Sequence, residues 1–463
     1  MELKQSKPYR QDKLLLAFCL AWKCILVTVA ALSPGPGYDT SALIHSNPSL
    51  YRHAEFERDG YATRIALKLF RWDALYFVAA AQRGQVFEQE WAFSWAYSGV
   101  LRMITQLITR NELPSLNSYI WTAVAVSTLM HLSAVMTLFR LLNEMTGNPN
   151  GGRVSFVACV LHILSPAGLF LVSSYTESVF ASVNFLGMLY YVRARLAAST
   201  NKKQTIREDL LLVTSGFLFG LATVARSNGL LSGLIFLFDV AVCVPTALMN
   251  RLSRHELRSV LVTCVAGVFV AVGFVFPQYV AYQEYCTTGH GHGITAPWCQ
   301  RMIPSIYTWV QSKYWNVGLF RYWTLSNIPL FLLAAPMLCL LLQSSVAHLR
   351  YSRHNLSGID GQNTDNKNSD STQNRVPPDH LPQLALPQLV LAITATTSFH
   401  VQIINRISSG YPIWYLSVAR WVSASNTRPS DLFSKRSVQI VVRGMIMYAI
   451  IQGALFASFL PPA

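Results

Sequence analysis

The sequence predicts an all-α polytopic membrane protein, on the basis of its composition, its long apolar runs and the placement of its charges. Apolar residues make up 52% of the 463-residue chain and charged residues only 13%, about half the charged share of a soluble domain. The apolar residues form continuous runs, and a helix needs about 20 of them to cross a bilayer core. A β-barrel is disfavoured because its strands would alternate apolar and polar residues.

The net charge of +15 does not require a nucleic-acid partner, because the basic residues cluster at the ends of the apolar runs and so set topology. Lys4, Lys7, Arg10 and Lys13 precede the first run, Leu14 to Leu32, which predicts a retained signal anchor with a cytosolic amino terminus. About 10–12 transmembrane helices are expected. After the first run, spans are expected at about residues 119–142, 154–172, 174–195, 210–226, 229–250, 259–281, 328–344, 383–404, 411–424 and 438–459.

Two stretches between spans are expected in the lumen, and one in the cytosol. Residues 33–118 form the first luminal loop, in which Phe93, Tyr97, Val100, Ile104 and Ile108 recur at helical spacing. That spacing predicts an amphipathic helix in the membrane interface, with packing on neighbouring spans as the alternative. The second luminal loop covers residues 283–327, and residues 345–380 are expected to be a disordered cytosolic linker because they are too polar to bury a core.

The second luminal loop carries Cys286 and Cys299, which close a short ring and favour a disulfide in an oxidising compartment. His290 and His292 lie between them. A His-x-His pair with no third ligand is a weak metal signal, so no metal site is predicted.

Four ionisable residues, Asp73, Glu177, Arg226 and Arg406, fall at the same luminal level on four separate elements of this topology. Such groups in or near spans are costly and usually functional. A carboxylate can take a proton from a hydroxyl, and guanidinium groups bind phosphate. The alternative is structural: Glu177 would pair with an arginine, and Asp73 would be the N-cap of a helix over residues 74–82.

Together the motifs resemble those of GPI mannosyltransferase 2, the PIG-V family, in a form like that of filamentous fungi. The resemblance covers nearly the whole chain, in order. The matching residues are Arg71-Trp72-Asp73-Ala74, Glu88-Gln89-Glu90-Trp91-Ala92-Phe93, Ser165-Pro166-Ala167, Ser174-Tyr175-Thr176-Glu177-Ser178, Ala225-Arg226-Ser227-Asn228-Gly229, Gln278-Tyr279, Cys286, Pro297-Trp298-Cys299 and Arg406-Ile407-Ser408-Ser409.

The resemblance implies a GT-C type glycosyltransferase of the endoplasmic reticulum membrane. Such an enzyme would use dolichyl-phosphate-mannose as donor on the luminal side, without a metal or other cofactor. It would add the second mannose, α-1,6-linked, to the GPI anchor precursor. Its partners would be these two lipid-linked substrates, with room for a small membrane accessory subunit.

The resemblance makes Asp73 the catalytic base, with Glu177 binding the acceptor or orienting an arginine. Substrate-binding roles are expected for Trp72, Tyr76, Arg226, Asn228, Trp298 and Arg406. Arg226 and Arg406 would hold the leaving phosphate, and Trp72 and Trp298 would stack on sugar rings. Tyr76 stands where the family pattern commonly has His, which favours a packing or donor-contact role there. A transferase with another acceptor and a polytopic lipid or solute transporter are the alternatives.

Overall fold

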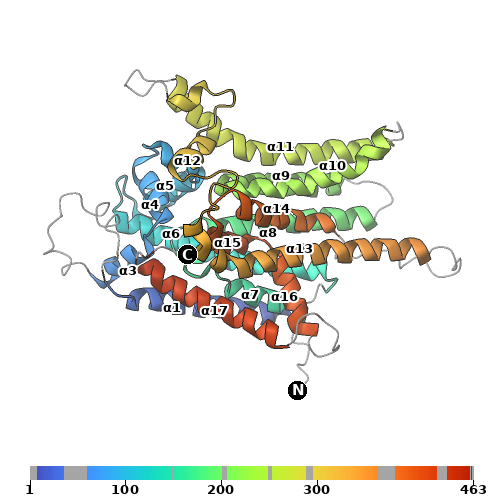
Figure 1. Cartoon of the computed structure of the whole chain (residues 1–463), viewed down its shortest axis with the longest axis horizontal. Helices are drawn as coiled ribbons and strands as arrows, with labels where there is room; N and C mark the ends of the chain where they lie inside the picture. The colour runs from blue at the N-terminus through green and yellow to red at the C-terminus, as the bar shows by residue number, and fades with distance from the viewer. Residues whose placement is uncertain are drawn as a thin grey trace.

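The computed structural model describes residues 8–35, 60–148, 151–200, 206–248, 253–287, 296–362, 381–424, 435–458 and 460. These residues form helices and connecting turns, with no strand among them (Figure 1). Seven of the described helices are long and apolar enough to cross a membrane. They are α1 (Pro8–Leu32), α6 (Leu116–Met145), α9 (Ile206–Ala225), α10 (Gly233–Leu248), α11 (Arg254–Tyr282), α13 (Ile328–Gln362) and α17 (Lys435–Ala457).

Four further predicted spans contain helices that pack among these seven. They are α7 (Arg153–Ile163), α8 (Glu177–Thr200), α14 (Leu386–Thr397) and α16 (Ile413–Ala424). Every predicted span therefore contains a helix, and the all-α polytopic fold is confirmed. Glycines allow the tightest packing: Gly220 of α9 and Gly273 of α11 bring the two backbones into direct contact, as small residues do between membrane helices.

The predicted span 154–172 is interrupted at residues 165–168, where the Ser-Pro-Ala-Gly sequence itself favours a break; only its upper limit as a helix is corrected. It ends as α-helix at Ile163 and continues as a turn and a short 3₁₀ helix, η2 (Gly168–Leu171). Pro166 lacks the N–H that a helix interior needs, and Gly168 takes a φ of +41°, a conformation that favours glycine. The chain continues from this break into α8.

The predicted disordered linker is wrong over its first part. Helix α13 continues to Gln362 instead of ending near residue 344, and residues 363–380 lie outside the described residues. At the start of the segment, the Gln388 side chain donates to the hydroxyls of Ser344, at 2.8 Å, and Ser345, at 2.9 Å. These bonds secure the polar start of the segment, and extending an existing helix costs little.

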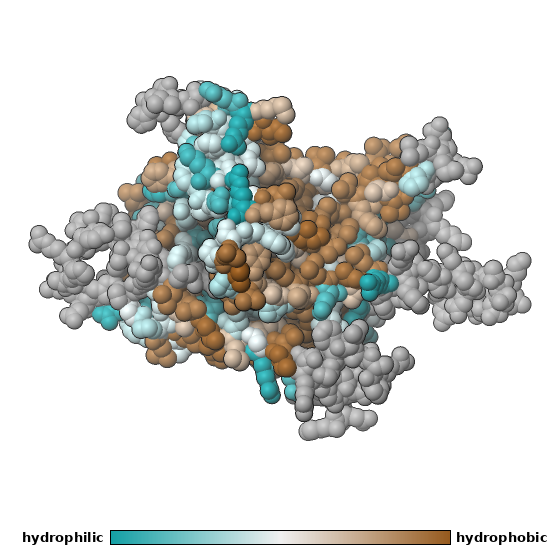
Figure 2. Space-filling view, in the orientation of Figure 1, coloured by the Kyte–Doolittle hydropathy of each residue, from teal (hydrophilic) through white to brown (hydrophobic). Residues whose placement is uncertain are grey.

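The elements between spans gather at one end of the bundle (Figure 1). They are α3 (Tyr61–Leu69), α4 (Asp73–Arg83), the 3₁₀ helix η1 (Glu88–Ala92), α5 (Trp95–Thr109) and α12 (Ile306–Tyr314). Hydrophilic residues collect near α12, whereas hydrophobic residues cover much of the adjoining surface along the long helices (Figure 2). The visible face thus has a polar end and an apolar flank.

Helix α5 is the predicted amphipathic helix. It combines the two expected arrangements, since one face packs on the protein and another is exposed. Tyr97 and Leu101 are buried against the protein, while Met103, Leu107 and Ile108 are exposed. An exposed apolar face beside a packed one suits a helix at the edge of a membrane. Its position in the membrane interface stays a prediction.

Candidate active site

Asp73 begins α4, directly after a strained turn. Trp72 has a φ of +54°, which is unusual for a bulky residue and is found where the surrounding structure imposes it. The Tyr175 hydroxyl bridges this turn, since it donates to the Arg71 carbonyl and accepts from the Asp73 backbone N–H, each at 3.1 Å. The residue preceding α4 is Trp72 and caps it with no side-chain hydrogen bond, so the N-cap alternative for Asp73 is wrong.

The Asp73 carboxylate instead reaches across to α15 (Ile404–Ile407). Arg406 Nη2 donates to Asp73 Oδ2 at 2.5 Å, and Arg406 Nε lies 3.6 Å from Glu177 Oε1. Arg226 Nη1 donates to the same Glu177 oxygen at 2.7 Å. The four residues that the sequence placed at one level therefore form a continuous ion-pair network that joins α4, α8, α15 and the turn after α9.

Glu177 is the buried centre of this network. Its side chain is 1% exposed, compared with 13% for Arg406 and 26% for Asp73. Burial lowers the pKa of Arg406, but the adjacent carboxylates of Asp73 and Glu177 raise it by more, so the guanidinium stays charged. The rings of Phe170 and Tyr175 lie 5.1 and 5.4 Å from the same guanidinium and add cation–π attraction.

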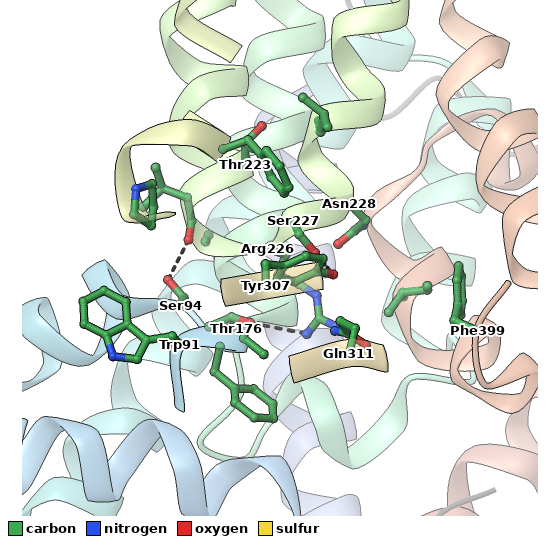
Figure 3. A pocket seen from close by; sticks show the side chains of 18 of the residues that line it. Trp91, Ser94, Thr176, Thr223, Arg226, Ser227, Asn228, Tyr307, Gln311 and Phe399 are labelled. Carbon is green, nitrogen blue, oxygen red and sulfur yellow. Dashed lines mark hydrogen bonds between the residues drawn. The ribbon is translucent and has the colours of Figure 1, made fainter. Parts of the chain in front are cut away.

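Arg226 is held by the turn that follows α9. Its Nη1 also donates to Thr176 Oγ1 at 3.3 Å (Figure 3). A Cβ at Gly229 would lie 2.6 Å from the Thr223 backbone nitrogen, so the turn closes on itself only with glycine there. Asn228 joins the turn to the residues just before α16, because its amide donates to the Tyr411 hydroxyl at 3.0 Å.

A cavity of about 620 Å³ opens beside the network, within the range of about 300–1,000 Å³ usual for ligand sites. Asp73, Arg226 and Arg406 are its charged lining residues, and Tyr76 and Asn228 also line it. Apolar side chains make up much of the wall. In Figure 3, Arg226 extends from its turn toward Tyr307 and Gln311 of α12.

Comparison with known proteins identifies the family of the chain. The family model described as mannosyltransferase (PIG-V) matches residues 12–463. The chain belongs to this family. It is 40% identical to a GPI mannosyltransferase 2 of Aspergillus oryzae, over 100% of this chain and 97% of that protein. It is 38% identical to one of Gibberella zeae, over 96% of each. Among solved structures it is similar to the apo oligosaccharyltransferase of Archaeoglobus fulgidus, with a TM-score of 0.42 and 13% identity, over 96% of this chain and 56% of that one.

For this PIG-V family member, the structure changes the expected role of Glu177. Glu177 does not line the cavity; it lies behind the two arginines and holds both. This position favours the orienting role for Glu177 over direct contact with the acceptor. Membership of a mannosyltransferase family also removes the transporter alternative.

The two tryptophans expected to stack on sugars do not line the cavity. Trp298 is fully buried, and its indole N–H donates to Glu88 Oε1 at 3.0 Å, so it serves a separate packed cluster. Trp72 is partly buried against the main core. The sequence could not separate a sugar-facing tryptophan from a packed one, because both occur in polar loops near the same motifs.

Tyr76, by contrast, does line the cavity. Its ring stacks on that of Phe93, with centroids 4.4 Å apart, and Trp315 lies edge-on to both. Burial, and then the nearby charges of Asp73 and Glu90, raise the pKa of Tyr76, so its hydroxyl stays protonated at neutral pH. The position acts as an aromatic wall, in line with the expected packing or donor-contact role.

Sequence reasoning missed the contribution of α12 and the following turn. Tyr307, Gln311 and Trp315 line the cavity, as does His400 from the segment after α14. Tyr307 shares a hydrogen bond of 2.7 Å with Ser227, next to Arg226. The only available signal was the aromatic density of residues 307–315, which does not show which side faces a ligand.

The predicted cysteine pair is joined by a disulfide in the structure, with Cα atoms of Cys286 and Cys299 5.7 Å apart. Within the described residues, no group of three or more His, Cys, Asp or Glu is arranged to hold a metal. His290 and His292 lie outside the described residues.

Proposed function

We propose that this protein transfers the second mannose, α-1,6-linked, from dolichyl-phosphate-mannose to the GPI anchor precursor. Transfer would take place at the luminal face of the endoplasmic reticulum membrane. The family is that of mannosyltransferases, and the relatives carry the name GPI mannosyltransferase 2. The observation that carries the proposal is that one carboxylate and two guanidiniums line the same cavity.

Asp73 is the base in the proposed reaction. The acceptor hydroxyl oxygen attacks the anomeric carbon from the side opposite the phosphate and gives its proton to the Asp73 carboxylate. The bond from the anomeric carbon to the phosphate oxygen breaks, and dolichyl phosphate leaves with the electron pair. Arg406 binds Asp73 Oδ2, and Oδ1 accepts no hydrogen bond from the described side chains, which leaves one oxygen for the proton.

Arg226 and Arg406 suit the leaving phosphate because of the charge balance of the network. With both carboxylates ionised, the charges of Asp73, Glu177 and the two arginines cancel. When Asp73 takes the proton, the network gains one net positive charge as the phosphate gains negative charge. A site that becomes complementary during the reaction stabilises the transition state more than the ground state.

The lining of the cavity suits lipid-linked substrates, and the position of α1 suits the proposed topology. The cavity wall includes apolar residues of η3 (Ser227–Ser232), α11 and α14, among them Leu231, Phe274 and Leu391, which suit a lipid-linked substrate. Lys68 of α3 donates to the Ala31 carbonyl, so α1 ends beside the cavity end of the bundle. Its 25 residues span about 37 Å, which supports the proposed cytosolic position of its basic amino-terminal end.

A microsomal transfer assay with labelled dolichyl-phosphate-mannose and a monomannosyl GPI precursor tests the proposal. Asp73→Asn should lower transfer by about 10²–10⁴-fold, the usual contribution of a positioned base. Asp209→Asn is the matched control, because Asp209 pairs with Arg258 between α9 and α11, away from the cavity. Full transfer by a normally expressed Asp73→Asn variant would disprove the assignment of Asp73 as the base. If the wild-type protein transferred mannose only to other acceptors, the assignment of the GPI precursor as acceptor would fail.

A further inference from the structure

One carboxylate outside the ion-pair network accepts hydrogen bonds from three side chains in and just before α12, a helix that lines the cavity through other residues. Glu88 Oε1 accepts the indole N–H of Trp298 at 3.0 Å. Its Oε2 accepts the indole N–H of Trp309 at 3.1 Å and the hydroxyl of Tyr314 at 3.2 Å. We propose that Glu88 is a positioning residue for mannosyl transfer, because it holds α12 in place as a wall of the substrate cavity.

Glu88 is well placed for this because its own element lines the cavity. It is the first residue of η1, and the residues that follow it, from Trp91 to Trp95, all line the cavity. The donors Trp309 and Tyr314 lie on α12, and Trp298 lies just before it. The Glu88 side chain therefore links η1 and α12, which both line the cavity.

Helix α12 has nine residues, fewer than an isolated helix needs to be stable in water, so it depends on such anchors. At its start, the Ser305 hydroxyl donates to Gln278 of α11. Just past its end, the Trp315 carbonyl lies 2.9 Å from His400 Nε2. Glu88 supplies the anchor between these two ends.

The charge of Glu88 matters as well as its shape. Hydrogen bonds to an ionised acceptor are roughly twice as strong as neutral ones. Arg301 and Lys313 lie 4.8 and 4.7 Å from the Trp309 ring, so the indole that donates to Glu88 also lies against two cations. Both interactions hold Trp309 in one orientation.

The functional consequence follows from what α12 presents to the cavity. Tyr307, Gln311 and, at its end, Trp315 face the space beside Arg226 and Asp73. Trp315 completes the ring cluster with Tyr76 and Phe93. If α12 moves, this polar and aromatic wall moves with it, whereas the Asp73–Arg406–Glu177 network stays in place. The inference rests on the proposed function for its effect on transfer, but not for its effect on α12.

The test uses Glu88→Gln in the full-length protein. The glutamine amide has one oxygen that accepts and one NH2 group that donates. It therefore cannot accept from all three donors, and at least one hydrogen bond is lost. Hydrogen exchange of the peptide over residues 296–315 should become about ten-fold faster, the factor for one lost hydrogen bond. Exchange over residues 73–83 should not change. Transfer should show a KM about ten-fold higher for the acceptor or the donor, with a smaller change in kcat. Glu112→Gln, an exposed glutamate after α5, is the control for both readouts.

A double-mutant cycle separates positioning from general loss of stability. Trp309→Phe keeps an aromatic ring and removes the donor, and Glu88→Ala removes the acceptor of all three bonds, so these two changes should be non-additive in both exchange rate and KM. Additive effects, or unchanged exchange over residues 296–315 in Glu88→Gln, would overturn the proposal. Faster exchange at α12 without any change in transfer would limit Glu88 to a structural role and would also overturn it. A wild-type protein that transfers no mannose would refute the proposed function, while the exchange data would still test the anchor.

Discussion

Replacing Glu177 with Gln tests the central assignment of the network, namely that Glu177 orients the arginines and Asp73 takes the proton. Coulomb's law with an effective dielectric constant of about 20 gives about 6 kcal/mol for charges 2.7 Å apart, the distance from Glu177 Oε1 to Arg226 Nη1. Desolvation of the 1%-exposed carboxylate offsets part of this. Removing one partner of a buried pair costs about 3–5 kcal/mol, which is the expected loss in the free energy of unfolding.

The matched control is Glu144→Gln. Glu144 also pairs with an arginine at 2.7 Å, but Arg193 is 40% exposed and Glu144 is 23% exposed. Solvent screening reduces such pairs to about 0–1 kcal/mol. Thermal unfolding in detergent should therefore separate the two Glu→Gln variants clearly, although their ion-pair distances are equal.

The transfer assay then separates the two carboxylates of the network. Glu177→Gln should lower kcat by about 10²-fold, similar to the loss of one donor to developing charge. Asp73→Asn should lower kcat further, by up to about 10⁴-fold, because it removes the base itself. The reasoning would be refuted if Glu177→Gln lowered kcat as much as Asp73→Asn or more.

Four further outcomes are expected. Arg226→Lys should raise the KM for the donor about ten-fold, because an ammonium cannot bind Glu177 and a phosphate in the planar geometry of a guanidinium; unchanged kinetics would remove Arg226 from phosphate binding. Tyr76→Phe should retain transfer at all pH values from 6 to 8, because the raised pKa of Tyr76 keeps the hydroxyl neutral there and the stack on Phe93 needs only the ring. Tyr76→Ala should lose transfer, and equal activity of the two variants would contradict a wall role. Cys299→Ser should lower stability by about 3 kcal/mol, the entropy of a loop of about 15 residues, as measured by thermal unfolding beside a Cys339→Ser control, whose cysteine is free and exposed. Dialysis against EDTA should leave transfer unchanged, and loss of activity that Mn²⁺ or Mg²⁺ restores would contradict the metal-independent proposal.

Much of the fold could be predicted from the sequence, because membrane spans are set by local composition. A continuous apolar run must be helical in lipid, since each backbone polar group needs an internal partner. All eleven predicted spans accordingly contain helices. The inaccurate boundaries are those of α13, which continues past residue 344, and of the third span, which Pro166 and Gly168 interrupt.

The candidate site shows the same division. The sequence by itself identified Asp73, Glu177, Arg226 and Arg406, because charged groups beside apolar runs are costly and hence rare. It could not tell which of the four faces the substrate. Only the tertiary structure placed Glu177 behind the arginines and the other three on the cavity wall.

Tertiary structure also decided which aromatic residues line the cavity. Trp298 and Trp315 both lie between α11 and α13, yet one is fully buried and the other lines the cavity. Trp298 donates to Glu88, 210 residues earlier in the chain, and packs with Trp91 and Ala281. Trp315 instead follows α12, which Glu88 binds through Trp309. Composition determines that a segment is helical, polar or aromatic, whereas the direction of each side chain is set by partners that only the folded chain brings together.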